Sequence, residues 1–168
     1  NDIKSFVVKL SPSGNLMWAI KLPFLSFPFR ITTDGLGNIY LAQNFNSAIT
    51  IGSVTLSPPT VGWNTCFLKV NPNGSIGWVK SRSPIGQHFY PVIVGSNTEG
   101  FYLSNQFSLS ATNFGSELTK FDGAGNSVWN KTIQNFDVTY HLTIDSYENL
   151  YLTGIGGNGT YQFGSFSL

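Results

Sequence analysis

Short apolar segments separated by turn-forming residues run along the whole chain. The first example is FVVKL (6–10), which passes through Ser, Pro, Gly and Asn into LMWAIKL (16–22). Runs rich in Val, Ile, Phe, Tyr and Thr that are bounded by Gly, Pro, Asn and Asp are typical of strands joined by tight turns. No stretch of ten or more residues places its apolar side chains at the spacing of a helix face. The pattern therefore predicts an all-β chain.

The phrase that joins the first two predicted strands occurs three times, as LSPSGNLMW (10–18), VNPNGSIGW (70–78) and FDGAGNSVW (121–129). Its Lys, Gly and Trp positions keep an offset of 60 residues from the first copy to the second, and of 51 residues from the second to the third. These positions are Lys9, Gly14 and Trp18; Lys69, Gly74 and Trp78; and Lys120, Gly125 and Trp129. Constant offsets exclude insertions inside the phrase, which indicates one structural unit present in three copies.

Two further blocks recur in the same order after each copy of the phrase. The first is a turn followed by an apolar residue, Tyr and Leu, and it contains Tyr40, Tyr102 and Tyr151. The second is a Gly-Ser block centred on Gly52, Gly115 and Gly164. The pattern within each repeat therefore predicts two hairpins, that is, four short antiparallel strands.

Several predicted strands carry apolar side chains on both faces, as in IYL (39–41). Such sheets must be covered on both faces, and stacked sheets achieve this. Four-stranded sheets that repeat every ~40 to 50 residues and cover one another describe the blades of a β-propeller. We expect one propeller-like region over 1–168, with blades of roughly 1–56, 57–115 and 116–168. The recurring Trp and Tyr residues should fill the gaps between blades. The stems of the matching lysines should pack while their ammonium groups reach the rim, or a carboxylate or carbonyl of the adjacent blade. A ligand-binding role repeated once per blade is the alternative for these lysines.

The order of these motifs resembles a known bacterial family. The series Phe-x-x-Lys-Leu-x-x-x-Gly-Asn-x-x-Trp, then Asp-x-x-Gly-Asn-x-Tyr, then Phe-Gly-Ser is similar to the β-propeller repeats called SBBP repeats. The resemblance covers essentially the whole chain three times, although Ser96 replaces the usual Asp and the Gly-Gly after the Trp is missing. The resemblance implies a secreted or surface-attached protein without a catalytic role.

Three blades are fewer than the 4 to 8 that typically close a propeller. An open stack would leave two aromatic faces exposed to water. The chain is therefore expected to belong to a longer repeat array, to close a six-bladed ring from two copies, or to be buried against a partner. Protein partners or self-association through the open blade faces follow from each of these arrangements.

The amino-acid composition excludes several classes of function. Only 10% of the residues are charged, compared with about 25% in an average domain, so the surface must consist largely of Asn, Ser, Thr, Gln and Gly. The net charge is +1 and the nine basic residues do not cluster, which argues against nucleic-acid binding. No apolar run approaches the ~20 residues of a membrane span. This polar, charge-poor composition favours an extracellular or cell-surface location.

Residue types that carry chemistry are few and scattered. His88 and His141 occupy non-equivalent positions of their repeats, and no His or Cys spacing matches a zinc site. Cys66 lies in the apolar strand NTCFLKV, where we expect a buried thiol that packs as a small hydrophobe. We therefore predict no catalytic residue, no metal and no cofactor, and a protein that is not an enzyme.

The best binding candidates are aromatic and histidine residues outside the repeated blocks: Trp63, His88, Tyr90, Tyr140 and His141. Exposed aromatic side chains on the loops of a rigid scaffold can stack on carbohydrates or extended peptides. We predict a non-catalytic extracellular or surface module that binds partners or serves as a structural scaffold. A glycan-binding, lectin-like propeller is the alternative, and a fragment of a propeller hydrolase or lyase is a third interpretation.

Overall fold

A computed structural model describes residues 4–23, 29–58, 62–82, 87–110, 113–134, 138–156, 160, 162–163 and 166–167. Every regular element in these residues is a strand, which confirms the all-β prediction. The strands are β1 (Lys4–Leu10), β2 (Leu16–Pro23), β3 (Arg30–Thr33), β4 (Ile39–Phe45), β5 (Ile49–Ile51), β6 (Val54–Leu56), β7 (Asn64–Val70), β8 (Ile76–Arg82), β9 (Gln87–Gly95), β10 (Phe101–Ser110), β11 (Asn113–Phe121), β12 (Ser127–Gln134), β13 (Val138–Ile144), β14 (Leu150–Ile155), β15 (Gln162–Phe163) and β16 (Phe166–Ser167).

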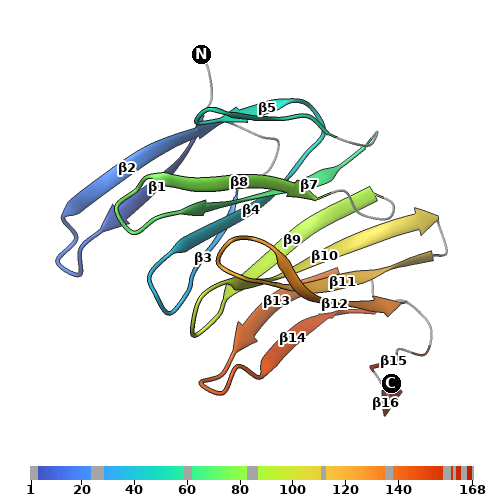
Figure 1. Cartoon of the computed structure of the whole chain (residues 1–168). Coiled ribbons are helices and arrows are strands. Elements are labelled where there is room, and N and C mark those ends of the chain that lie inside the picture. Colours follow the sequence, from blue (N-terminus) through green and yellow to red (C-terminus); the bar gives the residue numbers. More distant parts are fainter. Residues whose placement is uncertain are drawn as a thin grey trace.

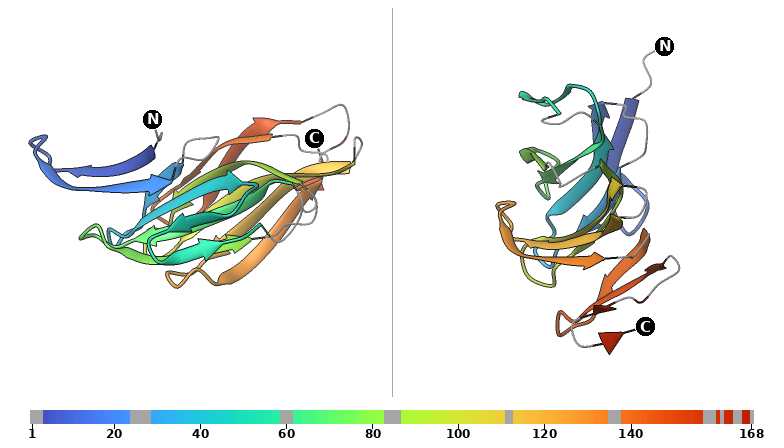
Figure 2. Two further views of the ribbon diagram at one scale, coloured as in Figure 1. Left: turned by 90° about the horizontal axis from the view of Figure 1, so that it is seen from above. Right: turned by 90° about the vertical axis from the view of Figure 1, so that its right-hand side faces the viewer.

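Two four-stranded antiparallel sheets form the middle of the molecule (Figure 1). The first sheet has the order β3-β4-β7-β8, and the second has the order β9-β10-β11-β12. A two-stranded hairpin lies beyond each of them: β1–β2, the N-terminal hairpin, and β13–β14, the C-terminal hairpin. Figures 1 and 2 show these four bodies following one another in chain order like the segments of a fan.

The sheets are offset from the expected blade boundaries by one hairpin. The predicted blade 1–56 would have joined β1–β2 to β3–β4, but the first sheet joins β3–β4 to β7–β8 of the following repeat. The pairing of Tyr40 with Lys69 and of Tyr102 with Lys120 fixes this arrangement in both sheets. Residues 56/57 and 115/116 therefore do not separate two sheets, and the hairpins at the two ends are half-sheets.

The Gly-Ser blocks do not all have the same structure, contrary to the sequence-based expectation. Gly52 forms the turn of the separate hairpin β5–β6, with a φ of +61° that favours glycine. Gly115 instead lies inside β11 and is paired with Phe107 of β10. The second repeat has a shorter connection, so β10 continues directly into its pairing with β11 and no additional hairpin forms.

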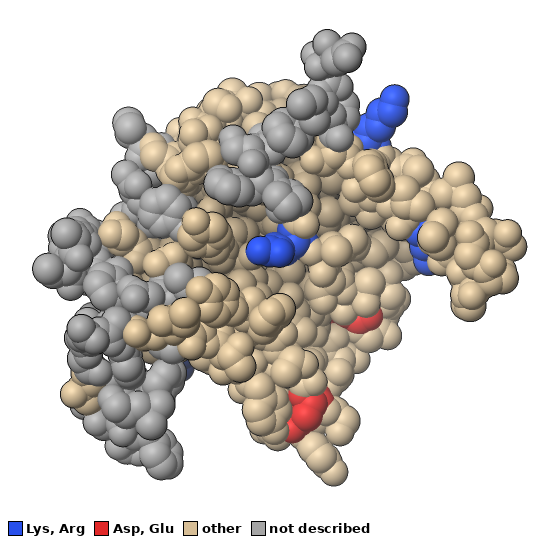
Figure 3. Space-filling view, turned by 180° about the vertical axis from the view of Figure 1, so that it is seen from behind, with Lys and Arg blue, Asp and Glu red and all other residues tan. Residues whose placement is uncertain are grey.

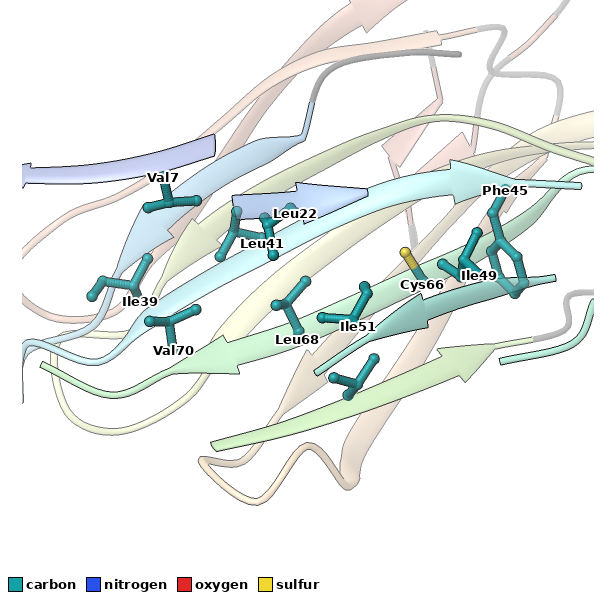
Figure 4. Packing of buried hydrophobic residues seen from close by; sticks show 11 residues of the cluster. Val7, Leu22, Ile39, Leu41, Phe45, Ile49, Ile51, Cys66, Leu68 and Val70 are labelled. Atoms are coloured by element: carbon teal, nitrogen blue, oxygen red, sulfur yellow. The ribbon is translucent and has the colours of Figure 1, made fainter. Parts of the chain in front are cut away.

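Apolar layers fill the spaces between the stacked sheets. Figure 4 shows the layer between the N-terminal hairpin and the first sheet, to which β5 also contributes. Its buried members are Val7, Leu22, Ile39, Leu41, Phe45, Ile49, Ile51, Cys66, Leu68, Val70 and Val79. The layer between the two four-stranded sheets consists of Tyr40, Ala42, Phe67, Ile93, Phe101, Leu103 and Phe121. Aromatic rings dominate this second layer, and Phe101 stacks on Phe121 with ring centroids 4.9 Å apart.

The first strands of successive sheets lie next to one another, because β9 contacts both β3 and β13. The turns within the hairpins β1–β2, β3–β4, β7–β8, β9–β10, β11–β12 and β13–β14 lie at one end of the sheets, which follows from the antiparallel pairing and from hydrogen bonds between neighbouring turns. The short connection from β10 to β11 lies at the opposite end. The connections that leave each sheet lie at the opposite end. The repeated parts of the sequence thus form the turn end and the sheet interiors, and the variable parts form the connection end.

Candidate interaction surfaces

Two of the three repeated tryptophans, Trp18 and Trp78, contact the neighbouring sheet, as the sequence predicted. Trp78 of the first sheet lies against Gly125 in the turn of the second sheet, and Trp18 lies in the same way against Gly74. The indole N–H of each tryptophan donates a 3.0 Å hydrogen bond to a backbone carbonyl of the turn that it covers. A Cβ at Gly125 would come within 2.8 Å of the Trp78 ring, and at Gly74 within 3.0 Å of the Trp18 ring. Both glycines also have a positive φ, so the position requires glycine for two reasons.

The third tryptophan and the first glycine of the series have no such counterpart. Trp129 contacts Tyr102 at a ring-centroid distance of 5.8 Å, yet no glycine turn of the described residues covers it. Gly14 has a φ of +82°, and a Cβ placed there would meet no atom within 4 Å. The N-terminal end of the molecule thus has a turn glycine without a tryptophan, and the C-terminal end has a tryptophan without a turn glycine among the described residues.

The repeated lysines cross between sheets, and this confirms the prediction that they reach a neighbouring carboxylate or carbonyl. Lys69 donates to Glu99 at 3.0 Å and Lys120 donates to Glu148 at 2.8 Å, in each case to the next sheet or hairpin. Lys9 donates to the carbonyl oxygen of Pro72 at 3.2 Å. These contacts hold the turn ends of adjacent sheets together.

The repeated tyrosines donate their hydroxyls to carboxylates at the same end. The Tyr40 hydroxyl donates to Asp34 at 2.9 Å, and the Tyr151 hydroxyl donates to Asp145 at 3.0 Å. Burial and the hydrogen bond to Asp34 raise the pKa of Tyr40 above its usual range. Asp34 is itself buried, but hydrogen bonds from Asn38, Tyr40 and Gly100 outweigh that burial and lower its pKa.

The second repeat has Ser96 where the other two have Asp, and the missing carboxylate comes from the next hairpin. Glu148 accepts hydrogen bonds from the hydroxyl of Tyr102 at 2.9 Å, from the backbone N–H of Asn97 at 2.7 Å and from the Ser96 hydroxyl. Burial disfavours its charge, but these bonds and the one from Lys120 outweigh that effect and lower the pKa of Glu148 to about 2. Glu148 itself has a φ of +64° in the turn between β13 and β14.

The sequence signalled part of this network. The Tyr positions and the Ser96 exception were visible, but Glu148 lies 52 residues from its partner Ser96 and in another repeat. The ion pair between Arg82 of β8 and Glu117 of β11 (2.6 Å) was likewise not expected, and it also joins the two four-stranded sheets. The signal that could have led to Glu148 is Tyr102, a repeated tyrosine whose own repeat lacks the aspartate that accepts its hydroxyl in the other two.

Cys66 is buried in the apolar layer between the N-terminal hairpin and the first sheet, as predicted. Burial raises the pKa of its thiol to about 12, so the reactive thiolate is suppressed. The residue thus serves as packing.

The predicted binding residues lie toward the connection end, on different elements. Tyr90 and Tyr140 lie on the neighbouring strands β9 and β13, next to irregularities in the pairing of each strand, and both are about half exposed (54% and 53%). His141 follows Tyr140 on β13 and is exposed. Trp63 directly precedes β7, which is an inner strand of the first sheet, and its side chain is partly buried. The structure therefore places Tyr90, Tyr140 and His141 on adjacent strands and Trp63 on another element; His88 lies in β9, and its side chain is outside the described residues.

Charged side chains form only isolated patches on the face shown in Figure 3. In the described parts of the chain, no group of three or more His, Cys, Asp or Glu side chains could hold a metal ion. Nor do those parts contain a helix long and apolar enough to cross a membrane. No family model matches the chain, and no curated protein matches it either.

Proposed function

We propose that this chain is a non-catalytic, extracellular or surface-displayed module of the β-propeller type, similar to SBBP repeats, that serves as a binding or structural scaffold. The stacking of two four-stranded antiparallel sheets through the same tryptophan-on-glycine contact carries the proposal. Propeller blades are arranged in this way, with the first strands of successive sheets side by side. The low charge content supports a location outside the cytoplasm.

The carboxylates that are held most tightly support a structural role. Glu148 accepts four hydrogen bonds from the second sheet and its turn, and Asp34 accepts one from Gly100 of the next turn besides those within its own hairpin. The pKa values of both carboxylates are lowered below the usual range. A general acid or base works best with a pKa near the ambient pH. These groups therefore serve to join sheets, which is what a scaffold requires.

Glycan binding is the second candidate, and the two half-exposed tyrosines on β9 and β13 favour it. Aromatic faces on a rigid scaffold stack on sugar rings. Tyr90 has a φ of +51°, a conformation that bulky residues rarely adopt and that often marks a functional position.

A glycan array followed by mass spectrometry of the retained sugars tests both candidates. If glycan binding holds, Tyr90→Ala and Tyr140→Ala should each weaken retention at least tenfold. Tyr147→Ala is the matched control, because Tyr147 is 86% exposed in a tight turn at the other end of the sheets. A protein that retains no glycan is consistent with the scaffold role alone. Cleavage of any glycan would contradict a non-catalytic module.

A further inference from the structure

Each end of the molecule presents half of a sheet. In both four-stranded sheets, the second strand pairs with the third: β4 with β7, and β10 with β11. The corresponding strand of the C-terminal hairpin is β14, and in the described residues it pairs only with β13. At the other end, β1 pairs only with β2 among the strands that the structure describes, although β7 and β11, its counterparts in the later repeats, each have two neighbours.

The two internal junctions specify how these free edges would fit together. In each junction the repeated Tyr is opposite the repeated Lys, as Tyr40 is opposite Lys69. Extending this register to β14 and β1 gives the pairs Leu150 with Leu10, Tyr151 with Lys9, Leu152 with Val8, and Thr153 with Val7. These pairs place Tyr151 and Lys9 as neighbours, as at both internal junctions.

Exposed apolar residues lie where this pairing would cover them. Phe6 is 73% exposed and Leu10 is 56% exposed, whereas the equivalent residues of β7, Cys66 and Val70, are fully buried. At the opposite end, Tyr151 is 54% exposed, although the other two repeated tyrosines are buried. Pairing β1 of one copy with β14 of another would bury the exposed apolar residues of β1 and the exposed tyrosine of β14.

The tryptophan-on-glycine contact supplies an independent match. Trp129 of β12 has no turn glycine of the described residues against it, and Gly14 has open space where the other two turn glycines have a tryptophan. Placing the N-terminal hairpin beside β14 would bring the turn containing Gly14 to the side of the second sheet that carries Trp129. It would thus recreate the contact that Trp18 makes with Gly74 and Trp78 makes with Gly125.

We propose that β14 pairs with β1 of a second copy of this chain, so that the N-terminal hairpin of one copy completes the C-terminal hairpin of the other as a four-stranded sheet. The two hairpins lie at opposite ends of the fan in Figures 1 and 2, so β14 does not reach β1 of its own copy in this arrangement. Two such junctions close two copies into a ring of six sheets. This inference rests on the proposed scaffold function and names its partner.

Disulfide trapping tests the register directly. In antiparallel strands, opposed residues have Cα atoms about 4.5 to 5.5 Å apart, and disulfides span about 4.4 to 6.8 Å. In the double variant Lys9→Cys with Tyr151→Cys, mild oxidation should therefore convert most chains into a covalent dimer on a non-reducing gel, and dithiothreitol should reverse it. The matched control is Val8→Cys with Tyr151→Cys, because Val8 projects from the opposite face of β1. It should give less than a tenth of the dimer.

Two controls keep the test decisive. Circular dichroism of both double variants establishes that they fold. If the Lys9→Cys with Tyr151→Cys variant does not fold, mixing the Lys9→Cys chain with the Tyr151→Cys chain should give a covalent heterodimer, because the native Cys66 is buried in both. Crosslinked monomer would show closure within one chain and would overturn the proposal, as would folded protein that forms no crosslink. Retention or loss of glycan binding is measured separately, so failure of the dimer does not decide the fate of the scaffold proposal.

Discussion

Tyr40 and Tyr151 occupy the same position of the repeat, and each donates its hydroxyl to an aspartate six residues earlier at nearly the same distance (2.9 and 3.0 Å). Tyr40 is completely buried between two sheets, whereas Tyr151 is 54% exposed at the end of the stack. The local structure is thus identical and only the neighbouring sheet differs. Each repeat therefore encodes its own hairpin and turn, whereas the burial of its tyrosine depends on the next repeat.

This division has an energetic consequence. In repeat proteins, stability is approximately the sum of the intrinsic terms of each repeat and the interfaces between neighbours. Equivalent substitutions in the middle and at the ends therefore separate the two terms. Such pairs of variants are compared at a protein concentration at which the chain is monomeric.

The largest difference is expected for tryptophan. Trp78→Ala should lower the free energy of unfolding by about 3 to 5 kcal/mol, because it empties a contact between two complete sheets. Trp129→Ala should cost less than half as much, since no glycine turn of the described residues covers that ring. Urea denaturation followed by circular dichroism measures both values. Equal losses would contradict the distinction between middle and end.

The tyrosine pair should show a smaller effect of the same kind. Tyr40→Phe should cost about 1 to 3 kcal/mol, because it leaves a buried carboxylate without one of its donors. Tyr151→Phe removes the same hydroxyl at the surface, where water replaces it, and should leave the free energy of unfolding nearly unchanged. The same denaturation experiment serves for both. A costly Tyr151→Phe would show that the terminal hairpin is already covered in the monomer.

Because Glu148 joins the C-terminal hairpin to the second sheet, its protonation should make the stability of this contact depend on pH. Its pKa is lowered from the usual 4.5 to about 2 in the folded protein, so its contribution to stability is complete above about pH 5 and is lost as the pH falls toward 2. Glu148→Gln should therefore lower stability at pH 7 and flatten the decline between pH 5 and pH 2. Melting temperatures across this range provide the measurement. An unchanged acid dependence in the variant would exclude Glu148 as a main source of it.

Much of the local structure could be predicted from the sequence. Constant offsets located the hairpins, the glycine turns and the tryptophans that cover them, and the matching lysines pointed to contacts between sheets. These features depend on residues that are close in sequence or that recur at fixed spacing. They are the parts of the fold that a single repeat encodes.

The grouping of hairpins into sheets could not be predicted in the same way. A periodic sequence looks the same wherever the period is taken to begin, so the pattern did not show that β3–β4 would pair with β7–β8 rather than with β1–β2. Glu148 also escaped prediction, because it compensates for Ser96 from a different repeat. Both features depend on contacts between repeats, which composition and spacing do not encode.

The mass of the chain in solution tests the central claim that its two ends complement one another. Sedimentation equilibrium over a range from micromolar to millimolar protein should reveal a species of twice the 18.4 kDa of a single chain. Trp129→Ala should shift that equilibrium toward the monomer, because it removes one half of the terminal contact. A single species of 18.4 kDa at every concentration would contradict the account.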